Sequence, residues 1–376
     1  MDAQIDLEAL PGCERKKMDI PDSVNFNKYS CLLRPFIRLL VASLIVCVVA
    51  GGVASARIGR LPDRGADKPS AEAAQGCARV LRLHPAAGAK PAADIRLLRP
   101  ADKMKDGDAC ALYEKAAQSL PAGLDWDSLD AWLSKPLEEL PLADVNSTLL
   151  RFGRTLELLE QAAGFKEADW PWVEVEDMLP TRQNWRQFLS VLALNSRRHL
   201  KCRHYVLAAQ TLQTGFGIAA HLAKGPNPIY GLTGVGVSAR MCREVELFVQ
   251  QPGAPGLGAA LDSMPRPFID MTEQLEAEAI DPNDRLGVRI RHLSMRVDQH
   301  IAALRCVELV RLHAARRGTL PDSLGQITGV TIPTDPVIGK KFAYRRDRQR
   351  AFLTGSIPDG GDATDTTRYE LTLSRR

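Results

Sequence analysis

The chain has 376 residues, of which 45% are hydrophobic and 25% are charged, and it carries a formal net charge of +4. These proportions are typical of a globular protein and exclude a chain that is disordered throughout. Because the net charge is small and Lys and Arg are spread along the chain, the composition favours no nucleic-acid partner.

The first distinctive segment, residues 39–56, reads LLVASLIVCVVAGGVASA and contains no charged residue. At a rise of 1.5 Å per residue, a helix of this length spans roughly 27 Å, close to the hydrocarbon thickness of a bilayer. We therefore predict a transmembrane helix, or signal-anchor, preceded by a cytoplasmic segment, residues 1–38. The segment ends in Ala54-Ser55-Ala56, which has the form of a signal-peptidase site, so secretion after cleavage near Ala56 is the alternative.

Residues 57–107 are rich in Ala, Pro, Gly and isolated charges and show no sustained hydrophobic period. This composition predicts a flexible linker.

Helical spacing of apolar residues begins at Asp108 and predicts a helical domain over residues 108–283. Helices are also expected at residues 228–251 and 267–280, and a long helix from Asp284 to Arg317, ending at Gly318. The alternation of small and large residues after Tyr205 resembles the packing of tetratricopeptide-like hairpins, although no period of about 34 residues recurs. Two apolar stripes define the first helices: Cys110, Tyr113, Ala116, Ala117 and Leu120, then Leu149, Phe152, Leu156, Leu159 and Ala163.

The glycines of TGFG and YGLTGVGV invite a nucleotide-binding interpretation. Gly231, Gly234 and Gly236 do not form G-x-G-x-x-G, and no strand is predicted before them. We therefore expect these small residues to let helices approach one another.

The segment DWPWVEVEDMLP, residues 169–180, combines two indoles with acidic side chains. Trp170, Trp172 and Glu174 are a candidate groove for a ligand or a partner, and a hydrolase site near Trp170 to Glu176 is one functional alternative. The simpler interpretation, which we favour, is a rigid loop whose indoles cap the helical core.

The chain over roughly residues 108–362, and most clearly over residues 225–270, resembles an uncharacterised family of bacterial cell-envelope proteins with a short N-terminal anchor, a helical body and a pilin-like tail. The motifs that carry the resemblance are QQPGAP at residues 250–255 and PRPFID at residues 265–270, supported by ALYEKA at residues 111–116. The resemblance implies architecture and location, and it implies no chemistry.

The C-terminal part, residues 284–376, resembles the corresponding part of type II secretion pseudopilins, in which a helix, a proline-rich loop and a short antiparallel sheet follow one another. Here the turn is Asp335 to Gly339, and strands are expected at residues 342–346 and 351–354. The membrane segment is not continuous with the helix before this sheet, and no prepilin-peptidase motif occurs, so assembly into a pilus does not follow.

The loop SIPDGGDATD occupies the place where some pseudopilins bind calcium. Asp359, Asp362 and Asp365 are therefore candidate calcium ligands, although calcium needs six to eight oxygens. The alternative, which we favour, is a solvated acidic loop that leads to a final strand at residues 369–373. No other cofactor is expected.

These observations predict a mainly α protein: a helical bundle or array with a small antiparallel β module at the C-terminus, preceded by a transmembrane helix and a linker. We expect a non-enzymatic, single-pass protein of the inner membrane, with most of its chain outside the cytoplasm, that acts as a helical protein-interaction or scaffold module. Its expected partners are the bilayer, through residues 39–56, and other envelope proteins. The alternatives are an envelope hydrolase and an accessory component of a secretion or pilus-like system.

Overall fold

The computed structural model describes residues 78–85, 95–172, 178–361 and 363–374. The predicted membrane helix at residues 39–56 lies outside these ranges. Within them, no helix combines the length and the apolar character needed to cross a bilayer.

Short helices form the first layer of the helical body. Most of the predicted apolar stripes are buried: Cys110, Tyr113 and Ala116, then Leu149, Phe152, Leu159 and Ala163. Ala117, Leu120 and Leu156 are half-buried. A side-chain cap begins α3, where Asp125 accepts a hydrogen bond from the backbone of Ser128. The elements are β2 (Lys105–Asp108), α2 (Cys110–Gln118), α3 (Trp126–Ser134), α4 (Leu142–Arg151), α5 (Gly153–Ala162) and β3 (Phe165–Glu167), with short 3-10 turns η1 (Ala101–Lys103) and η2 (Leu137–Glu139).

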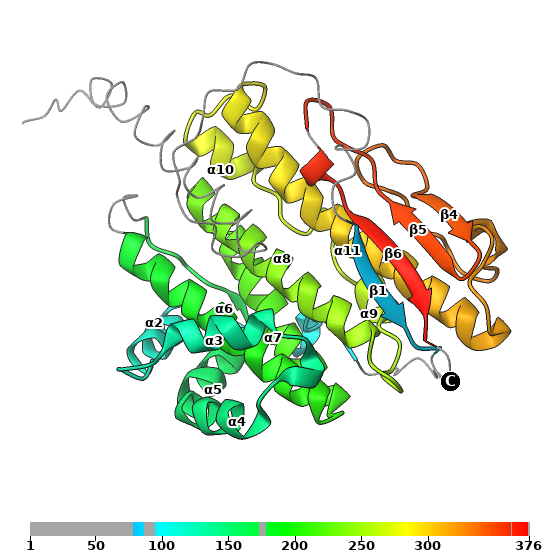
Figure 1. The fold of residues 1–376 in the computed structure, drawn as a ribbon. Helices are drawn as coiled ribbons and strands as arrows, with labels where there is room; N and C mark the ends of the chain where they lie inside the picture. Colours follow the sequence, from blue (N-terminus) through cyan, green and yellow to red (C-terminus); the bar gives the residue numbers. More distant parts are fainter. Residues whose placement is uncertain (1–77, 86–94, 173–177, 362, 375–376) are drawn as a thin grey trace, which may run out of the picture. The chain divides into compact units, whose positions relative to one another are not determined.

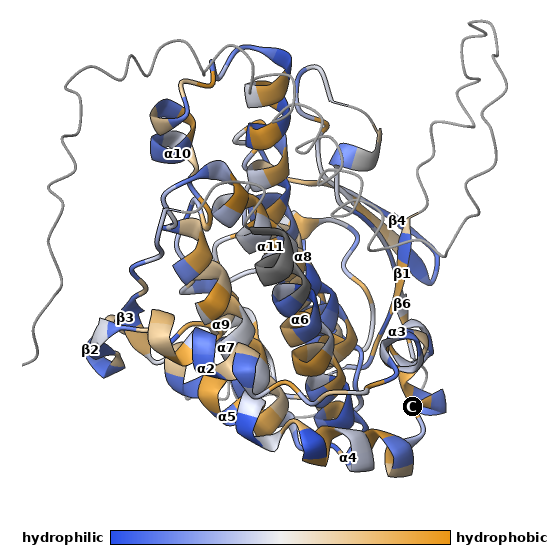
Figure 2. Ribbon diagram, turned by 90° about the vertical axis from the view of Figure 1, so that its left-hand side faces the viewer, coloured by the Kyte–Doolittle hydropathy of each residue, from blue (hydrophilic) through white to orange (hydrophobic). Residues whose placement is uncertain are grey.

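Three long helices build the centre of the body: α6 (Met178–Lys201), α7 (Tyr205–Ala223) and α8 (Pro228–Val249). Helices α7 and α8 approach closely because small residues lie between them. An added Cβ at Gly215 would lie 2.1 Å from Sδ of Met241, and one at Gly234 would lie 3.0 Å from the carbonyl oxygen of Ala219. The interpretation of these glycines as helix-packing residues is confirmed. Figure 2 shows hydrophobic and hydrophilic residues alternating along these helices, as expected of helices with buried and exposed faces.

The remaining helices are α9 (Gly258–Asp262), α10 (Thr272–Ala277) and α11 (Arg285–Arg317). Helix α11 begins at the predicted place, where Asp284 caps Gly287, and ends at Gly318, whose φ of 73° is left-handed. The helix predicted at residues 267–280 is shorter, because the chain bends at residues 266–269 and α10 begins only at Thr272. Helix α11 packs along α8, and residues 108–283 and 284–376 fall within the same compact unit.

A four-stranded sheet completes the fold, with the strand order β1-β6-β5-β4. Helix α11 lies between this sheet and helices α6 to α8 (Figure 1). The predicted antiparallel hairpin and final strand are confirmed as β4 (Ala343–Asp347), β5 (Arg350–Thr354) and β6 (Arg368–Leu373). A 3-10 turn, η3 (Leu324–Gln326), lies between α11 and β4, and a second, η4 (Ala363–Asp365), lies between β5 and β6.

The fourth strand, β1 (Arg79–Leu83), pairs in parallel with β6. The assignment of residues 57–107 to a flexible linker is therefore wrong for this segment. Leu81 and Leu83 are buried, with 2% and 0% of their surfaces exposed, while Val80 between them is 60% exposed. This alternation is the period of a half-buried strand, and its pairing partner lies at the other end of the chain.

Candidate functional site

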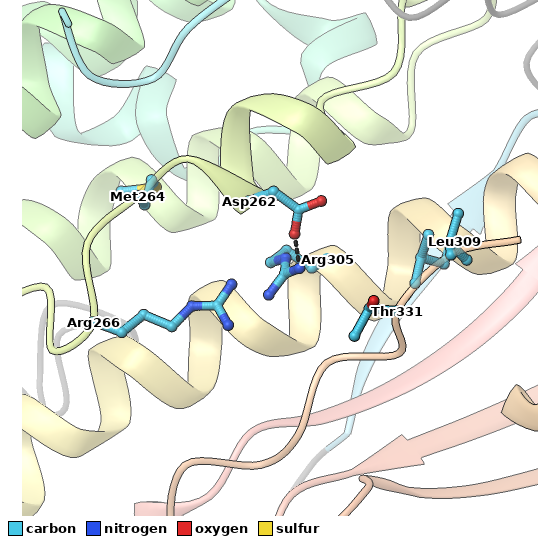
Figure 3. Close-up of a pocket in the computed structure, with 7 residues that line it drawn as sticks. Asp262, Met264, Arg266, Arg305, Leu309 and Thr331 are labelled. Atoms are coloured by element: carbon cyan, nitrogen blue, oxygen red, sulfur yellow. Dashed lines mark ion pairs between the residues drawn. The ribbon is translucent and has the colours of Figure 1, made fainter.

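A cavity of about 610 Å³ opens beside α11 (Figure 3). Three segments build it: the end of α9 with the chain that follows, the middle of α11, and the loop between η3 and β4. The lining residues are Asp262, Met264, Arg266, Arg305, Leu309, Val330 and Thr331. The first segment includes the PRPFID motif, and Arg266 of that motif lines the cavity.

The PRPFID segment is fixed to the helices on both sides of it. The backbone N–H of Phe268 donates to the Asp298 carboxylate of α11 over 2.8 Å. The Phe268 ring is buried and meets the edge of Phe216 on α7, with 5.8 Å between ring centroids. Burial raises the pKa of Asp298 to about 6. The anchored segment holds Met264 and Arg266 against the pocket.

Arg305 and Leu309 lie four residues apart on α11 and therefore share one face of that helix. The Arg305 side chain is 10% exposed and forms an ion pair with Asp262. Its Nε is buried and has no hydrogen-bond partner among the described residues. Figure 3 shows Arg266 extending along the pocket toward Arg305. Two guanidinium groups thus face the cavity with one carboxylate, which leaves it a net positive charge.

The pocket combines charged, apolar and polar side chains. Its seven described lining residues supply cationic donors, apolar surface and one threonine hydroxyl, and the single carboxylate is already paired with Arg305.

The structure describes two of the three residues of the predicted groove, Trp170 and Trp172. Trp170 stacks between Tyr113 and Tyr230, at centroid distances of 5.2 and 5.5 Å. Its indole N–H donates to the carbonyl oxygen of His221 over 2.9 Å. Trp172 is 56% exposed, and Glu174 lies outside the described residues. Trp170 therefore caps the helical core, as the simpler interpretation expected, whereas Trp172 does not.

The same aromatic cluster contains a histidine that the sequence did not single out. His221 Nε2 lies 2.9 Å from the carbonyl oxygen of Phe165, and Nδ1 lies 2.8 Å from the hydroxyl of Tyr113. Because a carbonyl only accepts, Nε2 carries the proton and Nδ1 accepts from Tyr113. Burial lowers the pKa of His221 and raises that of Tyr113. His221 is thus a neutral link between α2, α7 and β3.

The candidate calcium ligands do not form a site among the described residues. Asp365 is 1% exposed, and both its oxygens accept hydrogen bonds of 2.7 Å from Arg289. Asp359 is exposed, and Asp362 lies outside the described residues. The part of the chain that the structure describes contains no group of three or more His, Cys, Asp or Glu side chains that could hold a metal ion. Asp365 serves as the partner of a guanidinium group.

A buried carboxylate joins the sheet to the helices. Oε1 of Glu246 on α8 accepts from Arg79 on β1 over 2.5 Å, and from His300 on α11 and Tyr369 on β6 over 2.7 Å each. Burial alone favours the neutral acid, but the hydrogen bond and charge of His300 and the charge of Arg79 lower the pKa of Glu246. Burial lowers the pKa of His300. The cluster fixes β1 and β6 against both helices.

A second buried cluster explains the Asp335 to Gly339 turn. Asp335 is fully buried and accepts from the backbone of Ser356 over 2.5 Å and from Gln299 of α11 over 3.1 Å. The Gln299 carbonyl accepts from the backbone of Thr367 over 2.8 Å. The turn, the loop after β5 and the start of β6 therefore meet on one side chain of α11.

The chain matches no protein-family model, no curated protein and no solved structure.

Proposed function

We propose that this protein is a non-enzymatic envelope protein, anchored through residues 39–56, whose folded body binds other proteins. The observation that carries the proposal is the pocket beside α11, which offers two guanidinium groups and apolar walls to a partner. The buried clusters around Glu246 and Gln299 support a binding role, because they fix the segments that line the pocket relative to the sheet. The apolar segment LLVASLIVCVVAGGVASA supports the anchor.

A second proposal is an accessory role in a secretion or pilus-like system. It rests on the order of a long helix, the Asp335 to Gly339 turn and antiparallel strands, which the structure retains in α11, β4, β5 and β6. Identification of the bound partner separates this proposal from a general scaffold role.

Site-specific photo-crosslinking in living cells tests the binding function. A photoreactive residue replaces Val330, which lines the pocket and is 39% exposed. The matched control replaces Leu150 on α4, which is 82% exposed and does not line the pocket. We expect discrete protein adducts from position 330 and none of the same mass from position 150. Identical adducts from both positions, or none from position 330, would contradict the proposal.

Membrane fractionation tests the anchor in the same cells. The full-length protein is expected to stay with the membranes through an alkaline carbonate wash, because a spanning helix resists extraction that removes peripheral proteins. Release of the full-length chain, or a mature N-terminus at Arg57, would show that residues 39–56 do not anchor it.

A further inference from the structure

We propose that the pocket between α9, α11 and residues 330–331 binds a carboxylate that carries an apolar group. This deepens the proposed binding function, because it names the chemistry that the pocket recognises. A terminal residue of a polypeptide and a free organic acid both supply this chemistry.

The charge of the pocket defines the anionic half of the ligand. Arg266 and Arg305 bring two positive charges, and Asp262 neutralises one of them. Among the seven lining residues, a single negative charge therefore completes the balance, which a carboxylate supplies, whereas a phosphate group carries about 1.5 to 2 charges near neutral pH. The planar fork of an arginine matches the two oxygens of a carboxylate.

Arg305 supplies the first guanidinium group. Its side chain is 10% exposed, lines the cavity and pairs with Asp262. A carboxylate in the cavity accepts from this group at the side that faces the cavity. Arg266 is exposed and extends into the same space, so it can close on the second ligand oxygen (Figure 3).

The other walls define the apolar half of the ligand. Met264 is buried, Leu309 is half-buried and Val330 is 39% exposed, and all three face the cavity. The volume of about 610 Å³ lies within the range of small-molecule sites, roughly 300 to 1,000 Å³, so an apolar side chain fits beside the carboxylate.

Calorimetric titration of the detergent-solubilised full-length protein tests the proposal with defined probes. One arm compares phenylbutyrate with phenylbutyramide, and the other compares a short peptide ending in leucine with the same peptide amidated at its C-terminus. We expect millimolar binding of at least one acid, and binding of its amide about tenfold or more weaker, because hydrogen bonds to charged groups are stronger than neutral ones. Tighter binding of the peptide acid identifies a chain end as the ligand, and tighter binding of phenylbutyrate identifies a free acid.

Three variants locate the binding. Arg266→Gln changes an exposed side chain and is expected to weaken the acid about tenfold. Val330→Glu adds a negative charge to the wall and is expected to abolish binding. Arg291→Gln, an exposed position on α11 that does not line the pocket, is the matched control and is expected to bind like the wild type.

Equal binding of acid and amide, tighter binding of inorganic phosphate, an Arg266→Gln variant that binds like the wild type, or no binding of either acid would each overturn the inference. Its failure is distinguishable from that of the proposed function. Acid binding without protein adducts at position 330 rejects the protein-binding role and retains the carboxylate site. Adducts at position 330 without acid binding retain the protein-binding role and reject the carboxylate site.

Discussion

Replacing Arg311 with methionine perturbs the interior where α11 meets the QQPGAP connector. The Arg311 side chain is fully buried. It holds together segments from three parts of the chain. Its guanidinium donates to four acceptors: the carbonyl oxygens of His84 (3.2 Å), Pro255 (3.3 Å) and Ala254, and the carboxylate of Glu308 (3.2 Å).

The expected loss of stability comes from the buried groups that lose their partner when Arg311 is replaced. Methionine fills part of the arginine volume but supplies no donor, so Glu308 loses its ionic partner in a site where burial already raises its pKa. Removing one partner of a buried ion pair costs about 3 to 5 kcal/mol. The three carbonyl groups add to this, at roughly 1 kcal/mol for each lost hydrogen bond, with partial overlap. We therefore expect Arg311→Met to reduce the free energy of unfolding by about 4 kcal/mol or more.

Chemical unfolding of the solubilised full-length protein, followed by tryptophan fluorescence, measures this loss. Arg316→Met, at an exposed position on the same helix, is the matched control and is expected to change stability by less than about 0.5 kcal/mol. Adding Glu308→Gln to Arg311→Met is expected to recover about 1 kcal/mol or more, because the residues are coupled. A loss below about 1 kcal/mol for Arg311→Met, or strictly additive effects in the double variant, would refute the reasoning.

Three further predictions concern other parts of the fold. In unfolding experiments, Trp170→Ala is expected to reduce the free energy of unfolding by about 3 kcal/mol or more as a core truncation. Trp172→Ala is expected to reduce it by less than about 0.5 kcal/mol, and similar losses for the two variants would contradict the assignment of Trp170 to the core. Because burial raises the pKa of Asp298 to about 6, its stabilising contribution is present at acid pH and is lost as the pH rises through about 6. Thermal melting should therefore find Asp298→Asn more stable than the wild type above about pH 7 and similar to it near pH 4, and a pH-independent difference would count against the raised pKa. Asp365→Asn is expected to lower the melting temperature equally with calcium or a chelator, because Arg289 loses its partner; a calcium-dependent loss would support the metal interpretation.

Local signals predicted local structure well. The alternation around Phe342 and Ala351, and the Asp-Pro turn before it, placed the hairpin within one residue of its observed bounds. Gly318 ended α11 where predicted, because a left-handed residue closes a helix whatever lies around it. These features depend on residues that are close in the sequence, so a local sequence pattern can predict them.

Features that join distant segments were not predictable in the same way. RVLRL at residues 79–83 carries the period of a strand, but its partner β6 lies almost 290 residues later. Glu246 on α8 and its three partners, from β1, α11 and β6, lie far apart in the sequence, so no spacing indicates that they converge. The same holds for the pocket, where Arg266 and Arg305 meet only because PRPFID is fixed to α11.

The parallel pairing of β1 with β6 also makes residues 79–83 part of the folded body. A shortened chain that begins at residue 108, where the helical pattern starts, would lack β1. Strand β6 would then be an edge strand with unpaired N–H and C=O groups. The shortened chain would also lose the Arg79 donor to Glu246 and uncover Tyr369 and Leu371, which are 1% and 0% exposed. Such a chain is expected to exchange strands or aggregate through the unpaired edge of β6. In the intact protein, the five residues of β1 cover that edge.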